Sequence, residues 1–592
     1  MNHTYNKGRL WVRNIGKLFL AFSLSVLCLG CTDTDGLNIN EPKFTIYKIL
    51  PAIGKAKDTL TIHGIGFADA EKVLFNGVEG NIVSRNEETI KVIIPKVANQ
   101  VDSLVAGVKI RVYSPTQYRE RTISMKFSNS TFTLGQNKFK VDTVAHYLVG
   151  PGANYTCIDF TTATDSLRVY YLTMQVGTPN LRFEPVLAKD TIGAAERVID
   201  MGPRKTAQGR GQFFAGVNAD FFRMNDDNRI LDGMAVNGQL VALPIDAGGA
   251  SMIVERDGRL TIDELNYVNY KVTLGGTDVP LNAVNDKRGS NQLVMYNSNY
   301  GTTTHTNNFG TEVIIKPLAD GWSLVRPVEF EVTNVINGGG NSVIPEGCAV
   351  LSGHGSAQNI LNQLQVGDKG KFSIEINALN GEISDPLHIL GVKPMILKKG
   401  AHTSYVWDER HPRTALGLSQ DKRTVYFCVV DGRQSISKGV TVTHLADLMK
   451  RAGAFTAFNL DGGGSSTMYV YNDGYNATGL MNRPNGGTYS RSVANAFYAV
   501  ADVPDDNNVS QIASADYIVK AKRNAGVILR FCGMNRYGLM VDNNLSGVQL
   551  TVDPTFGTIE GEKLKVTGRA DEGEVTATYQ GATIKVKIVV EE

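Results

Sequence analysis

Most of the chain alternates between apolar and polar residues over short stretches that end in glycine, proline or asparagine, a pattern typical of β-strands joined by tight turns. Helical spacing is confined to three segments: 194–201, one that begins at Ser356, and one that follows Thr443 and stops at Gly453. Strands are predicted at 59–62, 72–75, 89–94, 167–176, 181–187, 212–217, 293–296, 312–315 and 425–430. We therefore predict an α+β fold with a β-dominated core.

The strand spacing also divides the chain into domains. A polar linker at 504–508 and breaks in the strand pattern give the following expected units: a signal peptide at 1–30, a tether at 31–42, an immunoglobulin-like β-sandwich at 43–128, a large domain at 131–502 and a second immunoglobulin-like domain at 512–592. We thus expect a large catalytic or binding domain flanked by two immunoglobulin-like β-sandwiches.

The N-terminus has the pattern of a secretory signal. Basic residues from Lys7 to Lys17 precede an apolar run at 18–30 that is too short to span a bilayer. The sequence Leu27-Cys-Leu-Gly-Cys31 resembles a bacterial lipoprotein box, which implies cleavage before Cys31 and lipidation of its thiol. The alternative is an ordinary signal peptide. The prediction is an extracytoplasmic protein, lipid-anchored in the outer membrane or on the surface of a Gram-negative bacterium.

Composition and charge limit the kinds of ligand and partner that the protein is expected to bind. The formal net charge of +2 over 592 residues gives no electrostatic footprint for nucleic acid. Cys157, Cys348, Cys428 and Cys532 are far apart and show neither metal-ligand spacing nor a dense disulfide framework. We predict no metal and no cofactor. The acidic stretch 226–228 is interpreted as a loop, since no complete EF-hand pattern surrounds it.

The stretch Asn459-Leu-Asp-Gly-Gly-Gly-Ser-Ser-Thr-Met-Tyr469 is the strongest local signal. Apolar runs on both sides predict strands, so the glycines form a tight turn at a sheet edge. Three consecutive glycines lower stability through backbone entropy, but they expose N–H groups that can approach an anion. The competing interpretation is a long hairpin turn with a solvated aspartate.

Polar residues also follow or precede other apolar strands, where rigid scaffolds place functional groups. Arg413 and Arg491 offer planar forks that suit a phosphate group. Asp461 is the first candidate for acid–base or nucleophilic catalysis, followed by Asp431 and Asp220. Asn218 and Asn495 could hold sugar hydroxyls or orient a carboxylate. These residues point to an anionic substrate if the strand ends converge, which sequence alone does not establish.

The large domain resembles the phosphodiester glycosidase family in an ordered set of motifs. They are Gly216-Val-Asn-Ala-Asp-Phe-Phe222, Gly233 with Asn237-Gly238, Arg413-Thr-Ala-Leu-Gly417, Asp431-Gly-Arg433, Asn459-Leu-Asp-Gly-Gly-Gly-Ser-Ser466 and Arg491-Ser-Val-Ala-Asn495. The resemblance implies cleavage of a sugar-1-phosphate diester to free sugar and a phosphomonoester. The site residues that it supports are Arg413, Asp461, Gly462, Gly463, Ser465 and Arg491. Thr414 and Asn495, which lie within the same motifs, are further candidates for substrate binding. The first domain similarly resembles the IPT/TIG family.

Two departures from the family pattern affect the pocket. Asp220 stands where relatives often have glycine, and Val392-Lys-Pro394 stands where they often have Gly-Gly-Pro. Bacterial relatives are associated with exopolysaccharide, so a polymer linkage is one candidate substrate. Two other functions stay open at this stage: a surface glycan-binding lipoprotein without activity, and a phosphodiesterase that cuts the other P–O bond.

Overall fold

The computed structural model describes most of the chain from residue 44 onward. The described ranges are 44–50, 56–96, 108–115, 118–123, 131–245, 249–318, 321–381, 383–471, 478–487, 489–514 and 519–591. The predicted signal peptide, the tether and Cys31 therefore lie outside the described residues. None of the helices in the described part is long and apolar enough to cross a bilayer.

The first domain is a seven-stranded arrangement closed around its own apolar core, which includes Leu60, Ile62, Phe75 and Val92. The predicted hairpin at Asn76 is present, because both turn residues adopt left-handed φ values that asparagine and glycine tolerate. The strand order is β1 (Thr45–Leu50), β2 (Thr59–Ile65), β5 (Thr89–Ile93), β4 (Val78–Arg85), β3 (Lys72–Phe75), β6 (Val108–Tyr113) and β7 (Tyr118–Ile123).

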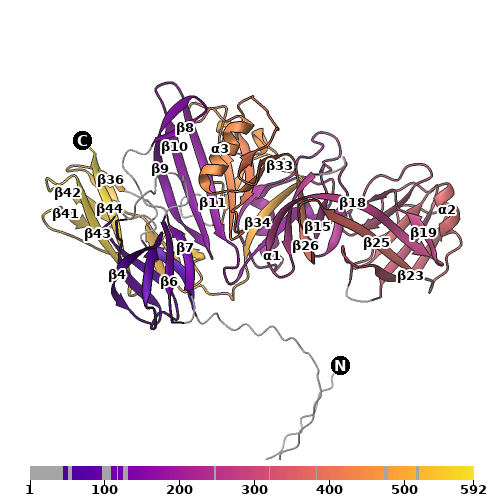
Figure 1. Ribbon diagram of the computed structural model, residues 1–592, viewed down its shortest axis with the longest axis horizontal. Coiled ribbons are helices and arrows are strands. Elements are labelled where there is room, and N and C mark those ends of the chain that lie inside the picture. Colours follow the sequence, from indigo (N-terminus) through magenta and orange to yellow (C-terminus); the bar gives the residue numbers. More distant parts are fainter. Residues whose placement is uncertain are drawn as a thin grey trace, which may run out of the picture. The chain divides into compact units, whose positions relative to one another are not determined.

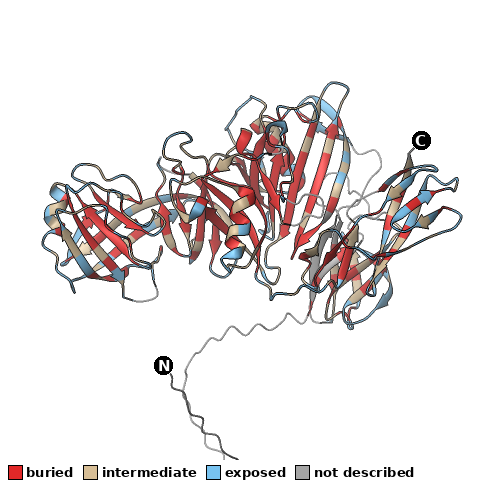
Figure 2. Cartoon of the chain, turned by 180° about the vertical axis from the view of Figure 1, so that it is seen from behind, coloured by how far each residue is buried: buried red, intermediate tan, exposed pale blue. Residues whose placement is uncertain are grey.

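The centre of the large domain is a pair of antiparallel sheets. The larger has nine strands in the order β28 (Ala401–His402), β27 (Met395–Lys398), β31 (Thr456–Asn459), β29 (Arg413–Leu418), β30 (Thr424–Val430), β11 (Ser166–Gln175), β10 (Ala153–Thr161), β9 (Asn137–Gly150) and β8 (Thr131–Leu134). The smaller has β12 (Leu181–Leu187), β34 (Asn495–Ala501), β14 (Gln212–Asn218) and β32 (Met468–Val470). Apolar residues from both sheets form one core, and Figure 2 shows their strands as mostly buried.

Helix α3 (Val442–Ala452) covers the other face of the nine-stranded sheet, as Figure 1 shows. Its apolar residues Leu445, Leu448 and Met449 face the sheet, which the sequence periodicity predicts. The helix begins at Val442, two residues earlier than expected, since Thr441 caps it by accepting a hydrogen bond from the amide of His444. Gly453 ends it in the left-handed conformation.

Two further helices complete the domain, along with a short pair of strands. Helix α2 (Ser356–Leu361) lies where a helix is predicted, but Ser356 is its first residue and not its cap: Gly355 is the N-cap and makes no side-chain cap hydrogen bond, and the helix ends before Leu364. Helix α1 (Val198–Ala207) begins later than the predicted segment 194–201, because residues up to Arg197 pair as β13 (Glu196–Arg197) with β33 (Ser492–Val493). The prediction of its bounds is wrong by about a turn, because tertiary pairing overrides local propensity.

A twelve-stranded sheet is inserted into this domain and encloses a second core. Its path is β16 (Gln239–Ala242), β15 (Met234–Val236), β26 (Pro386–Val392), β17 (Gly249–Glu255), β18 (Leu260–Leu274), β25 (Lys369–Ala378), β23 (Val328–Asn337), β22 (Thr311–Pro317), β24 (Ala349–Gly353), β21 (Leu293–Asn297) and β20 (Ala283–Val284), with β19 (Thr277–Pro280) beside β18. Leu240 of the first strand and Val284 of the last belong to the same cluster, so the sheet curls on itself.

The C-terminal domain consists of three small sheets around one apolar cluster that includes Leu564, Val575 and Ile588. The strands are β35 (Gln511–Ser514), β38 (Phe531–Met534) and β39 (Met540–Asp542); β36 (Val519–Lys522), β44 (Ala582–Glu591), β43 (Glu572–Tyr579) and β40 (Gln549–Val552); and β37 (Gly526–Ile528), β42 (Lys563–Val566) and β41 (Gly557–Glu560). The chain as described is thus β-dominated, with few helices.

Candidate active site

Strand ends from both central sheets meet at one edge. Strands β30 and β31 end there, and β29 begins there, because Arg413 pairs with Val430 and Ala415 pairs with Asn459. In the smaller sheet β14 ends at the point where β34 begins, with Asn218 opposite Ala496. The antiparallel registers therefore bring segments that lie hundreds of residues apart in sequence to the same place.

A cavity of about 210 Å³ opens at this edge. Five of the predicted site residues line it together. They are Arg413, Asp461, Gly462, Gly463 and Arg491. The remaining lining residues are Phe221, Trp407, His411, Arg433, Asn459 and Gly464. The strand ends that sequence could not connect thus share one small, strongly polar space.

Arg413 is the most constrained of the cationic residues. It is only 2% exposed, its Nε and Nη2 donate to the carbonyls of Val440 and Glu409 at 3.0 Å, and Trp407 stacks over its guanidinium at 4.6 Å. Burial lowers its pKa to about 10, so it stays charged at neutral pH. No carboxylate in the described part of the chain forms an ion pair with it, which leaves its charge available to a ligand.

Arg433 and His411 form a second donor group that sequence reasoning missed. Arg433 Nη1 donates to Asn485 Oδ1 at 3.2 Å, and Nη2 lies 3.1 Å from His411 Nδ1. Because a guanidinium only donates, His411 Nδ1 accepts, and its Nε2 carries the proton and faces Glu409 at 3.0 Å. The signal was present in the Asp-Gly-Arg motif, but nothing in the sequence places Arg433 beside His411.

The glycine run 462–464 forms another part of the cavity wall. Gly463 has φ of +64°, and a Cβ on Gly464 would lie 2.8 Å from both Arg491 Nη2 and Asn485 Nδ2. Side chains are therefore excluded at positions where backbone and guanidinium groups approach closely. The hairpin interpretation of this run is wrong, because β31 belongs to the nine-stranded sheet and β32 to the four-stranded sheet. The run crosses from one sheet to the other, directly over the cavity.

Asp461 is the sole carboxylate among the described residues that line this cavity. Burial raises its pKa to about 6, an effect that the Ser465 hydroxyl, the Gly462 amide and the charge of Arg491 partly offset. The Gly462 amide donates to Asp461 Oδ1 at 2.8 Å. The backbone of Asp461 is held as well, since its amide donates to the carbonyl of Ala219 and its carbonyl accepts from Asn218 Nδ2 at 2.7 Å.

Asn218 and Thr414 form a buried support beneath Asp461, and neither side chain lines the cavity. Asn218 Oδ1 accepts from Thr414 Oγ1 at 2.8 Å and from the amide of Thr467 at 3.0 Å. Asn495 supports the loop after β14 in a similar way, because its Oδ1 accepts a hydrogen bond from the amide of Asp220 at 2.9 Å. Ser465 is also fully buried. These predicted residues therefore hold the cavity's walls in position.

Asp431 lies behind the cavity and does not line it. Its carboxylate accepts from Tyr170 Oη at 2.8 Å, from Asn482 Nδ2 at 3.1 Å and from the amide of Arg483 at 3.1 Å. Burial raises its pKa to about 6 against these stabilising donors. The contacts fix the segment that leads to Asn485, so Asp431 anchors the residue that accepts a hydrogen bond from the cavity-lining Arg433.

Asp220 is also buried, 2% exposed, one residue from the cavity-lining Phe221. Its Oδ2 accepts from the amide of Asp232 at 2.8 Å. Burial, with the nearby charge of Asp232, raises its pKa well above the usual range for a carboxyl. Lys393, which departs from the family pattern, pairs with Asp232 at 3.1 Å. The two departures from the pattern thus belong to one buried cluster beside the cavity.

The comparisons with known proteins divide the chain into family segments. Residues 327–500 match the model of the family described as phosphodiester glycosidase, and residues 45–140 match that of the IPT/TIG domain. Residues 327–500 are thus similar to a phosphodiester glycosidase domain. The matched segment includes Arg413, Asp461 and Arg491, whereas the motif at 216–222 lies before it.

Individual relatives are distant. Cyclomaltodextrin glucanotransferase from a Bacillus species is 30% identical over 133 residues, which are 20% of this chain and 19% of that enzyme. The chain therefore spans about a fifth of the curated relative that it matches.

Similar solved structures include a hypothetical protein from Synechocystis, 14% identical with a TM-score of 0.42, covering 76% of this chain and 75% of that one. An exported protein from Burkholderia pseudomallei is 16% identical with a TM-score of 0.44, covering 75% and 93%. The catalytic domain of zebrafish N-acetylglucosamine-1-phosphodiester alpha-N-acetylglucosaminidase is 12% identical with a TM-score of 0.31, covering 62% and 90%.

Proposed function

We propose that this protein cleaves the bond between a sugar's anomeric carbon and the oxygen of a phosphodiester, releasing free sugar and a phosphomonoester. The observation that supports it is the convergence of Arg413, Arg433 and Arg491 on a cavity that also contains Asp461. Guanidinium forks bind phosphate oxygens in pairs, and no described carboxylate neutralises these three by an ion pair.

The single lining carboxylate, Asp461, fits this reaction better than it fits ordinary glycoside cleavage, which commonly uses two carboxyl groups. A phosphomonoester has a second pKa of about 6 and leaves as an anion, so it needs little protonation. In the proposed step the electron pair of the breaking C–O bond passes to the phosphate oxygen. Water attacks the anomeric carbon, and Asp461 accepts the proton that the water loses.

Trp407 extends the cavity on its outer side. Its side chain is 38% exposed, and it stands between Arg413 and His411 at 4.6 Å and 5.7 Å. An aromatic face next to the phosphate site offers a stacking surface for the sugar ring. The sugar itself is not fixed by these contacts. We propose an extracellular or cell-surface polysaccharide linkage, and lipid anchoring through Cys31, as the setting of the reaction.

The test uses purified protein with a UDP-sugar or a nitrophenyl sugar phosphodiester in water enriched in the heavy oxygen isotope. The expected products are free sugar carrying the isotope and an unlabelled phosphomonoester. Sugar-1-phosphate, or isotope in the phosphate, would establish cleavage of the P–O bond instead. Binding of the substrate without release of either product would favour a glycan-binding protein that lacks activity.

A further inference from the structure

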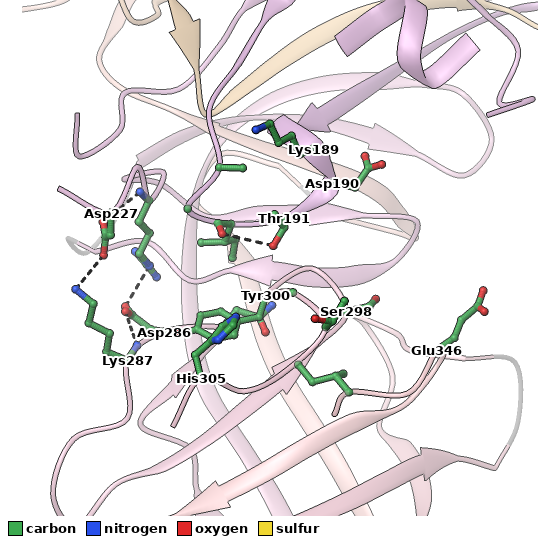
Figure 3. Close-up of a pocket in the computed structure, with 18 residues that line it drawn as sticks. Lys189, Asp190, Thr191, Asp227, Asp286, Lys287, Ser298, Tyr300, His305 and Glu346 are labelled. Carbon is green, nitrogen blue, oxygen red and sulfur yellow. Dashed lines mark hydrogen bonds and ion pairs between the residues drawn. The ribbon is translucent and has the colours of Figure 1, made fainter. Parts of the chain in front are cut away.

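A second and larger cavity, of about 730 Å³, shares no residue with the arginine-lined one. One wall is the segment after β12, from Lys189 to Ala194, and the opposite wall comes from the loops around β20 and β21. Figure 3 shows Asp190 and Thr191 across from Tyr300 and His305. The volume lies within the range of about 300–1,000 Å³ that is usual for ligand sites.

Most of the charges that line this cavity compensate one another in ion pairs, and Lys189 and Glu346, which form no ion pair among the described residues, are opposite in sign. Arg229, 4% exposed, pairs with Asp286 at 3.1 Å, and Lys287 lies 3.4 Å from Asp227. Asp190 is paired from behind by Lys205 at 2.9 Å. A charged ligand that contacts the paired groups would have to break one of these pairs, which costs free energy. Paired groups nevertheless keep donor and acceptor sites for a neutral ligand that is rich in hydroxyl groups.

An aromatic ring occupies the floor of the cavity. Tyr300 is half-buried and packs against Tyr296 at 4.7 Å between ring centroids, and the His305 ring centroid lies 6.0 Å from it. The Tyr296 hydroxyl donates to the carbonyl of Asp286 at 2.8 Å, which fixes this support. A rigid tyrosine provides contact area with little loss of conformational entropy on binding.

The walls are held in place before any ligand arrives. The amide of Ile192 donates to the carbonyl of Asn299 at 2.8 Å and joins the two walls. Asn285 and Asn297 are buried and exchange two hydrogen bonds, both of 2.9 Å. A site with fixed geometry loses less free energy on binding than one that must be ordered.

Backbone strain marks the same residues. Lys189, Asp190, Asn285 and His305 all line the cavity and have φ values of +50°, +58°, +51° and +49°. Each non-glycine residue in this region carries a conformational cost that the surrounding structure must offset. All four line this cavity, and none of them lines the arginine-lined one.

From these features we propose that this cavity is a second carbohydrate site, which binds a neutral oligosaccharide with one sugar ring stacked on Tyr300. Hydroxyl groups of the sugar accept from the basic side chains and donate to Asp286 and Glu346. Binding at this second site requires no catalysis, so it does not depend on the reaction proposed above. In a polysaccharide substrate it would hold a stretch of chain away from the bond that is cut.

The test measures binding of neutral tetrasaccharides of glucose, mannose or N-acetylglucosamine to the purified protein by calorimetry and saturation-transfer NMR. At least one should bind. Tyr300→Ala should weaken that binding at least tenfold, whereas Tyr300→Phe, which keeps the ring, should retain most of it. Asp461→Asn should bind normally even if it has lost activity, which separates this proposal from the catalytic one.

Ser298→Trp serves as a second variant, because Ser298 lines the cavity at an exposed position and an indole there would fill the space without disturbing a core. Tyr537→Ala, in the C-terminal domain, is the matched control and should bind like the wild type. Binding of none of the tetrasaccharides, unchanged binding by Tyr300→Ala and Ser298→Trp, or binding of inorganic phosphate alone in this cavity would overturn the proposal.

Discussion

Replacing Asp461 with asparagine should stabilise the protein while it removes activity. Burial raises the carboxyl's pKa from 3.8 to about 6, so the folded state holds an ionised group that it disfavours at neutral pH. Each pH unit between those values corresponds to about 1.4 kcal/mol, which gives an upper limit of about 3 kcal/mol. Because Asp461 borders a cavity and is only partly buried, solvent screens some of this, and we expect about 1–3 kcal/mol.

The pH dependence gives this prediction its sign. The folded-state pKa lies above the unfolded one, so the wild type is fully stable, in this respect, below about pH 4. The wild-type protein loses this part of its folding stability as the pH rises from about 4 through about 6, and above that pH the loss is complete. The asparagine variant has no proton to lose at this position. The two proteins should therefore unfold alike at pH 4 and differ most at pH 7–8.

Scanning calorimetry at both pH values measures this difference, as an increase of several degrees in the Tm of the large domain at the higher pH only. Turnover of the sugar phosphodiester should fall by about 10²–10⁴-fold, the usual contribution of general acid–base catalysis. An equal Tm shift at both pH values, or a destabilised variant, would refute the account of the buried charge. Near wild-type turnover would move the catalytic role away from Asp461.

Three further variants probe the other walls of the site. Asp431→Asn should destabilise the protein by about 1–3 kcal/mol at neutral pH, because the new amide group faces donors that the carboxylate accepts from. Calorimetry of this variant beside Asp461→Asn should show Tm changes of opposite sign. Arg413→Lys should reduce kcat/KM by about ten- to a hundredfold, since an ammonium cannot make a forked contact; unchanged kinetics would make this arginine structural. Gly464→Ala should weaken binding of inorganic phosphate severalfold in titration calorimetry by displacing Arg491, with little change in Tm; undiminished affinity would exclude Arg491 from the anion site.

The sequence predicts much of the fold because its local signals agree with the tertiary structure. The pattern of strands 59–94 and the Asn76-Gly77 turn are confirmed, as is the apolar face of α3. The start of α1 is predicted wrongly, because its first residues are taken into a strand pair by β33, which lies almost 300 residues away. Local periodicity carries no information about such a distant partner.

The candidate site shows the same limit. Glycines and arginines at strand ends point to an anion, but the function of each carboxylate depends on its environment. Asp431 and Asp461 look alike in sequence, since each follows an apolar strand, and burial raises both pKa values to about 6. Three donors occupy Asp431, whereas Asp461 opens onto the cavity. That distinction is set by residues such as Tyr170 and Asn482, which no local motif contains.

The motif Asp431-Gly432-Arg433 explains how so short a sequence can serve one site. Asp431 points inward and binds the segment before Asn485, whose side chain accepts a hydrogen bond from the cavity-lining Arg433. A Cβ on Gly432 would lie only 2.6 Å from the backbone nitrogen of Pro412, the residue before Arg413, so this position has no room for a side chain. Arg433, in a left-handed backbone conformation, lines the cavity and donates hydrogen bonds to both His411 and Asn485. Loss of any one of the three should loosen the contact between the arginine-bearing loops, so their effects on phosphate affinity should be strongly non-additive.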